Sequence, residues 1–170
     1  MSVLSRSELL EMVEGSPRLV EGICDRGVQV QPNGVELTLQ RIERFTGYGA
    51  VAYENSERVI APSEPIGFGS DGWVYLEPGV YKVIFNEVVN VPLGMAAIAR
   101  PRSSLTRCGV TVETGVWDAG YSGRSESMLV VYNRYGFRVK RNARLVQLVF
   151  FHLTKPVDVG YDGVYQGENR

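Results

Sequence analysis

The chain of 170 residues is 44% hydrophobic and 10% aromatic, which is enough to bury one core, so we expect a single globular domain. Eighteen Lys and Arg residues against 19 Asp and Glu residues give a formal charge of −1, which lacks the basic footprint of a nucleic-acid-binding protein. The two cysteines, Cys24 and Cys108, stand far apart, which excludes a disulfide framework and favours a reducing cytoplasm.

The only helix signal lies near the start of the chain. Ser5 or Ser7 can cap a helix over residues 8–13, which the Gly-Ser-Pro sequence at 15–17 ends. Strand signals dominate the rest, because short runs rich in β-branched and aromatic residues are separated by turn residues. The strands expected in chain order are residues 35–39, 79–85, 128–132 and 143–150. The sequence therefore predicts a mainly β fold, a barrel or sandwich, rather than βαβ units.

Residues 159–170 are the least regular part of the sequence. Glycines at 160, 163 and 167 and the lack of apolar periodicity indicate a segment outside the core. We therefore expect one β-rich domain over residues 1–158. Residues 159–170 are expected to form a C-terminal arm that orders on a ligand or on a neighbouring subunit.

A single histidine narrows the possible chemistry. His152 lies inside an apolar run, where a structural role is expected, and the HxE and PCxxC motifs of a zinc deaminase are absent. The first residues carry no basic-then-apolar leader, and no run of about 18 apolar residues occurs, so neither export nor membrane insertion is expected. Any reaction must rely on carboxylates, hydroxyls, arginines and a metal brought by the substrate.

Residues 99–107 combine two adjacent hydroxyls with three arginines. Ser103 and Ser104 stand among Arg100, Arg102 and Arg107, a composition suited to binding phosphate oxygens. If either serine caps a short helix, backbone amides also point at the anion. The alternative is a solvated basic loop with a capping serine.

Residues 114–124 read as a glycine-punctuated turn with one acid and one aromatic residue. Glycines at 115, 120 and 123 permit a tight hairpin. Asp118 is then expected near the bottom of a pocket, where it can orient and deprotonate a water molecule, and Tyr121 offers a flat face to a sugar ring. The alternative is an ordinary Asp-Ala-Gly turn without a function.

Two further segments carry polar side chains. Strand alternation places Arg138, Lys140, Asn142 and Arg144 on one side, as on a solvated edge, whereas Gln147 interrupts an apolar run and needs hydrogen-bond partners. Aromatic and amide side chains in the tail, residues 161–167, suit an arm that closes over a nucleobase or a phosphate chain.

Taken in this order, the segments resemble the superfamily of the trimeric dUTP diphosphatases and the metal-independent dCTP deaminases. Residues 30–39 are similar to the deaminase segment QPxSVDLRL, with Glu36 where Asp is usual, and residues 76–92 are similar to LEPGxxxLxxTxExVxVP. Residues 102–107 match the phosphate motif (K/R)SSLxR, and residues 115–123 are similar to the dUTP diphosphatase motif GxxDxxYxG. Residues 165–167 match the deaminase tail.

The resemblance implies a distorted β-barrel, the jelly-roll-like dUTPase fold, and hydrolysis of dUTP to dUMP and diphosphate. Asp118 maps onto the residue that activates water at the α-phosphorus, and Tyr121 onto the aromatic residue under the deoxyribose. Mg²⁺ is expected to arrive with the triphosphate, and a homotrimer with sites between subunits is implied. The other substrate-binding residues implied are Arg102, Ser103, Ser104 and Arg107 for the phosphates, Thr114, Gly115 and Val116 for uracil through the backbone, Gln147 for phosphate from an adjacent subunit, and Tyr161, Tyr165 and Gln166 for the arm.

A dCTP deaminase, alone or coupled to diphosphatase activity, is the first alternative. Its proton-shuttling glutamate falls on Val130 or Met128 here, neither of which can transfer a proton, and Glu126 is the only acid nearby. A non-catalytic nucleotide-binding protein is the second alternative. Two departures bear on the details: Val164 replaces the lysine usual in the deaminase tail, and Arg124 stands where dUTP diphosphatases often carry glutamate.

Overall fold

The computed structural model describes residues 2–170. Helix α1 (Arg6–Glu14) begins at the N-cap Ser5, whose hydroxyl accepts from the Glu8 amide while the Glu8 side chain caps Ser5 in return. It buries Leu9 and Val13 and ends at Gly15, so the predicted helix is confirmed. The remaining helical elements are α2 (Arg26–Gln29), α3 (Ser103–Arg107) and the 3-10 turn η1 (Asn55–Glu57).

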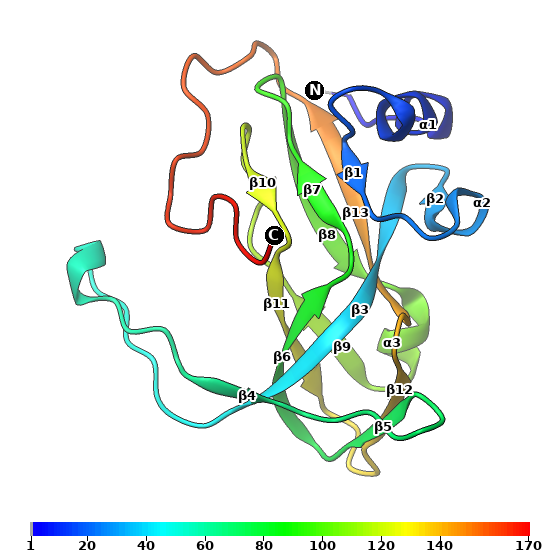
Figure 1. Cartoon of the computed structure of the whole chain (residues 1–170), viewed down its shortest axis with the longest axis vertical. Coiled ribbons are helices and arrows are strands. Elements are labelled where there is room, and N and C mark those ends of the chain that lie inside the picture. Colours follow the sequence, from blue (N-terminus) through cyan, green and yellow to red (C-terminus); the bar gives the residue numbers. More distant parts are fainter. Residues whose placement is uncertain (1) are drawn as a thin grey trace.

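Strands make up most of the regular structure (Figure 1). Their bounds are β1 Val20–Glu21, β2 Val30–Gln31, β3 Gly34–Phe45, β4 Ser63–Pro65, β5 Trp73–Leu76, β6 Gly79–Phe85, β7 Val88–Asn90, β8 Met95–Pro101, β9 Val110–Glu113, β10 Ser122–Gly123, β11 Glu126–Val131, β12 Phe137–Lys140 and β13 Arg144–His152. The largest sheet runs in the order β8-β13-β3-β6-β11-β9, with β2 and β4 also paired to β3. A second sheet, β1-β7-β10, lies against it, and β12 pairs with β5.

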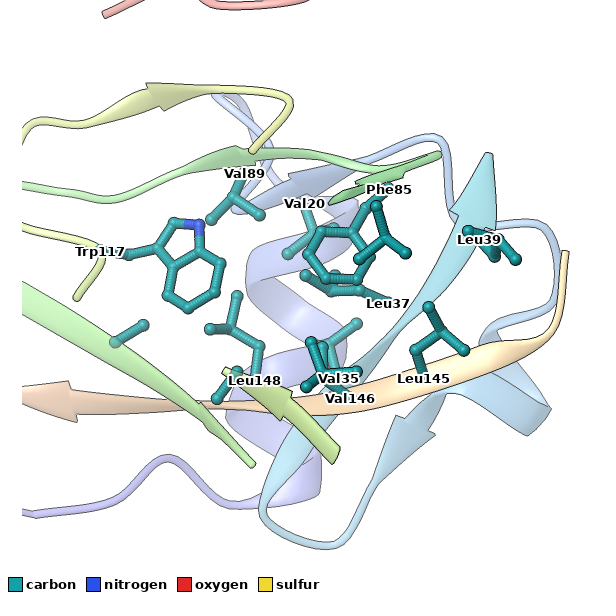
Figure 2. Packing of buried hydrophobic residues seen from close by; sticks show 14 of the residues in the cluster. Val20, Val35, Leu37, Leu39, Phe85, Val89, Trp117, Leu145, Val146 and Leu148 are labelled. Carbon is teal, nitrogen blue, oxygen red and sulfur yellow. The ribbon is translucent and has the colours of Figure 1, made fainter. Parts of the chain in front are cut away.

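The core lies between the curved main sheet and the β1-β7-β10 sheet. Leu37, Phe85 and Leu148 are fully buried, and Figure 2 shows them packed in one cluster with Val89 and Trp117. Each such side chain contributes about 1.5–3 kcal/mol when it leaves water, so burial of this cluster stabilises the packing of the two sheets. The prediction of a mainly β barrel-like fold is confirmed.

The structure corrects the local expectations at two places. The alternation expected from Arg138 to Arg144 is wrong, because Asn142 adopts a left-handed φ of 63° and breaks the run into β12 and β13. The N-cap of α3 is Arg102, so neither Ser103 nor Ser104 caps that helix. In β12, the guanidinium carbon Cζ of Arg138 lies over the ring of Trp73, 5.1 Å from the ring centroid.

Residues 159–170 contain no fully buried residue, yet they dock onto the surface of the domain. Residues 159–170 run back along the hairpin that contains β10 (Figure 1). Tyr161 packs against the core cluster, and its amide donates to the Ala119 carbonyl at 2.8 Å. Side-chain-to-backbone hydrogen bonds, which leave no periodic signal in a sequence, hold the tail in place. No helix within residues 2–170 has the length and apolarity needed to cross a membrane.

Candidate active site

The hairpin that carries Asp118 is anchored by a buried tryptophan. Trp117 and Ala97 of β8 exchange two backbone hydrogen bonds of 2.9 Å, and the Trp117 indole Nε1 donates to the Ser125 hydroxyl at 3.2 Å. Trp117 is 4% exposed, whereas the next side chain, Asp118, is exposed. A carboxylate is therefore held directly beside a rigid, apolar anchor.

Gly120 closes the turn after Asp118. Its φ is +87°, in the left-handed region that favours glycine, and its amide donates to the Val91 carbonyl at 2.8 Å. A Cβ at this position would lie 2.7 Å from the Cα of Gly160, where the tail crosses the hairpin. The Tyr121 amide then donates to the Asp118 carbonyl at 3.1 Å, which completes the turn.

A cavity of about 310 Å³ opens beside this hairpin. The exposed Asp118 and the buried Trp117 and Tyr121 all line it. Asp118 is therefore a lining residue of a pocket, beside two aromatic side chains. The lining residues are Ile60, Gly115, Val116, Trp117, Asp118, Tyr121, Ser125, Glu126, Tyr161, Tyr165 and Glu168.

The tail of the same chain completes the wall of this cavity. The Tyr121 hydroxyl donates to Glu168 Oε1 at 2.8 Å, and the rings of Tyr121 and Tyr161 meet edge to face at 5.8 Å. Burial raises the pKa of the Tyr121 hydroxyl, and the adjacent Glu168 carboxylate raises it further. Gln166 does not line the cavity but accepts from the Ser122 amide and donates to the Gly120 carbonyl.

Two acids in this cavity were missed or misplaced by sequence reasoning. Glu126, at the start of β11, lines the cavity with Asp118, and its Oε2 lies 3.1 Å from Lys82 Nζ. The signal that could have predicted this position of Glu126 is the two-residue alternation of side chains along a strand. No sequence signal points to Glu168, because the fold of the tail brings it there. Burial raises the pKa of its carboxyl group.

A second cavity, of about 400 Å³, contains the residues of the predicted phosphate site. Arg102, Ser103 and Ser104 lie at the start of α3, and Gln147 lies on β13. In the sheet, Gln147 stands opposite Glu36 of β3 on one side and Arg100 of β8 on the other. Opposed residues on adjacent strands point to the same face, so these three side chains form one row across the cavity.

The two cavities share no lining residue. Within one chain, Asp118 and Tyr121 therefore belong to one cavity, and Arg102 and Gln147 to the other. Of the remaining predicted site residues, Thr114 and Arg107 line neither cavity, while Gly115 and Val116 line the first. His152 ends β13 opposite Met95 and lines neither of the two.

The chemistry available to the two cavities differs. The first offers an exposed carboxylate beside aromatic surfaces, which suits a sugar and a water molecule. The second offers guanidinium groups, hydroxyls and an amide, which suit phosphate oxygens. Among residues 2–170, no group of three or more His, Cys, Asp or Glu side chains is arranged to hold a metal ion.

A comparison of the sequence with known protein families agrees with the resemblance seen in its motifs. Residues 3–153 match the model of the dCTP deaminase-like family. The chain belongs to this family. The chain is similar to the probable deoxyuridine 5'-triphosphate nucleotidohydrolase of Methanosarcina mazei, with 57% identity over 169 residues that cover 99% of each chain. The similarly named protein of Archaeoglobus fulgidus is 47% identical over 169 residues, which cover 99% of this chain and 98% of the relative.

A solved structure of the dCTP deaminase-like family shares the fold. The crystal structure of 2'-deoxycytidine 5'-triphosphate deaminase from Agrobacterium tumefaciens superposes with a TM-score of 0.66 and 22% sequence identity. The match covers 87% of this chain and 47% of that chain. The family and the fold implied by the sequence resemblance are thus both confirmed.

Proposed function

We propose that this protein is a dUTP diphosphatase, which hydrolyses dUTP to dUMP and diphosphate. The observation that carries the proposal is the placement of Asp118, whose carboxylate lines a cavity floored by Tyr121 in a chain that closely resembles proteins named for this activity.

In this reaction Asp118 orients a water molecule and accepts its proton. The water oxygen bonds to the α-phosphorus, and the bond from that phosphorus to the bridging oxygen breaks, so diphosphate leaves with the electron pair. The Tyr121 ring supports the deoxyribose, and backbone groups of Gly115 and Val116 read the uracil. Mg²⁺ arrives as part of the substrate, bound to phosphate oxygens and to water.

The division of the predicted residues between two cavities supports a site shared by two copies of the chain. One copy contributes Asp118 and Tyr121, and a neighbouring copy contributes Arg102, Ser103, Ser104 and Gln147 around the phosphates. A homotrimer satisfies this arrangement three times with one repeated interface. Tyr161 and Tyr165 close the first half of the site from the same chain, and Gln166 holds the tail in place through its bonds to Ser122 and Gly120.

We place the reaction in the cytoplasm. Cys24 and Cys108 are both free thiols and both exposed, which suits a reducing compartment.

Deamination of dCTP is the second candidate, and one observation favours it. Glu126 lines the same cavity as Asp118, so a second carboxylate is available for proton transfer. Its Oε2 is already engaged by Lys82 Nζ at 3.1 Å. We therefore rank hydrolysis of dUTP first.

A product analysis with dUTP, dCTP, dTTP and UTP side by side tests the proposal. We expect diphosphate and dUMP from dUTP, and much slower turnover of UTP. Release of ammonia from dCTP would replace the proposal with the deaminase alternative. Binding of dUTP without any product would leave a nucleotide-binding protein that is not an enzyme.

A further inference from the structure

The cavity at the start of α3 contains one acid, Glu36. The other charged residues that line it are Arg100 and Arg102. A carboxylate beside a phosphate chain repels it, and this repulsion is strong where water is scarce. Glu36 is only 5% exposed, so its charge must be engaged by the protein rather than by solvent.

Both carboxylate oxygens of Glu36 are engaged by arginines. Oε1 lies 2.6 Å from Arg102 Nε, and Oε2 lies 2.7 Å from Arg144 Nη1. The two arginines come from different elements, because Arg102 precedes α3 and Arg144 begins β13. Glu36 therefore ties the phosphate loop to the main sheet.

The contact with Glu36 occupies only one of the three guanidinium nitrogens of Arg102. Glu36 accepts from Nε, so the two terminal nitrogens of the planar guanidinium are left, and neither has a hydrogen-bond partner within residues 2–170. The Arg102 amide donates to the Leu145 carbonyl at 2.9 Å, which fixes the backbone as well. Because the backbone amide and the Nε of Arg102 are both hydrogen-bonded, the two terminal nitrogens keep one orientation. Two parallel N–H groups of this kind can bind two phosphate oxygens at once.

We propose that Glu36 is a positioning residue that holds the Arg102 guanidinium in the orientation that receives the diphosphate part of the substrate. Glu36 itself does not contact the substrate. Its negative charge is matched by the two arginines, so the cavity keeps a net attraction for anions. This inference rests on the proposed function, because the anion is taken to be the β- and γ-phosphates of dUTP.

The test is a double-mutant cycle between Glu36→Gln and Arg102→Ala, with the non-hydrolysable analogue dUpNHpp and with dUMP as ligands. We expect Glu36→Gln to weaken dUpNHpp binding by about ten-fold and dUMP binding by less than about two-fold. In the Arg102→Ala background, Glu36→Gln should weaken dUpNHpp no further. The same substitution should raise KM for dUTP more than it lowers kcat.

Glu43→Gln is the matched control. Glu43 lies on the same strand, is also 5% exposed, and is paired with Arg41 at 2.6 Å and Lys82 at 3.2 Å. It does not line the phosphate cavity. We expect a lower melting temperature with an unchanged ratio of dUpNHpp to dUMP affinity, since this substitution breaks a buried pair away from the phosphates.

Glu36→Asp keeps the charge on a shorter side chain, so its weakening of dUpNHpp should be smaller than that of Glu36→Gln, and it serves for the cycle if Glu36→Gln does not fold. Equal losses for dUMP and dUpNHpp, or an undiminished loss in the Arg102→Ala background, would overturn the proposal. If the wild-type protein binds dUpNHpp with this coupling but does not hydrolyse dUTP, the proposed function fails and the role of Glu36 stands. If the wild-type protein hydrolyses dUTP and Glu36→Gln changes neither the affinity for dUpNHpp nor KM, the proposed function stands and the role of Glu36 fails.

Discussion

At the scale of single residues, the hairpin of Asp118 depends on Gly120. Its left-handed φ of +87° and its close approach to Gly160 both exclude a side chain. This position joins the turn that presents Asp118 to the tail that walls the cavity. A substitution at Gly120 therefore affects both the turn of Asp118 and the docking of the tail.

We expect Gly120→Ala to destabilise the protein by about 1–3 kcal/mol, because the backbone is strained and the new methyl group meets the Gly160 backbone. Thermal unfolding measures the loss. Gly67→Ala is the control, since a Cβ at Gly67 meets nothing within 4 Å. Equal stability of the two variants would contradict the strain described for Gly120.

Glu168 should make the docking of the tail depend on pH. Burial raises the pKa of its carboxyl above the ordinary value of 4.5, so the docked tail favours the protonated form. As pH rises through the range above 4.5, the undocked carboxyl ionises more readily, and docking weakens.

Hydrogen exchange over residues 161–170, corrected for the intrinsic effect of pH, measures this docking. Protection should fall as pH rises above 4.5 in the wild-type protein and stay level in Glu168→Gln. A parallel fall in that variant would show that another group controls the tail.

The residues found from the sequence and those missed differ in a physical way. Asp118 and the Arg102 loop are contiguous motifs, so their chemistry could be predicted from local sequence. Glu168 belongs to the same cavity as Asp118 only because the tail folds back through side-chain-to-backbone hydrogen bonds. Such contacts follow no period, so sequence patterns could not have placed it.

At the scale of elements, the strands recovered from the sequence are those with strong β propensity. The predicted strand 79–85 has the bounds of β6, and 143–150 overlaps most of β13. Strand β8 was missed because three alanines and a terminal proline weaken its signal, although it pairs with β13 over seven residues. The pairing of distant strands that builds the phosphate cavity could not be derived from local patterns.

The approach of β3 to β13 depends on Gly34. A Cβ at this position would lie 2.6 Å from the Leu148 carbonyl oxygen and 2.8 Å from Gln147 Cγ. We expect Gly34→Ala to shift Gln147, to cost about 1–3 kcal/mol, and to weaken the binding of inorganic diphosphate.

Calorimetry with diphosphate and thermal unfolding measure both effects. Gly94→Ala, whose Cβ would meet only Pro156 Cγ at an ordinary 3.7 Å, is the matched control. If Gly34→Ala binds diphosphate as tightly as the wild-type protein, Gln147 has no role in binding the phosphates.

At the scale of the whole molecule, we expect a trimer in which each site needs two chains. Mixing Arg102→Ala subunits with Asp118→Asn subunits should restore activity, because some sites then receive Asp118 from one copy and Arg102 from another. With equal amounts and random assembly, about one quarter of the sites are intact. If native mass spectrometry shows mixed trimers and the mixture still stays inactive, both residues belong to one chain's site.

The most direct test of the central claim compares the wild-type protein with Asp118→Asn in turnover of dUTP and in binding of dUpNHpp. The amide keeps the shape of the side chain but cannot accept the proton of water. We expect kcat to fall by about 10³-fold or more while the affinity for dUpNHpp stays within about three-fold. Comparable turnover by both proteins would contradict the claim that Asp118 activates the attacking water.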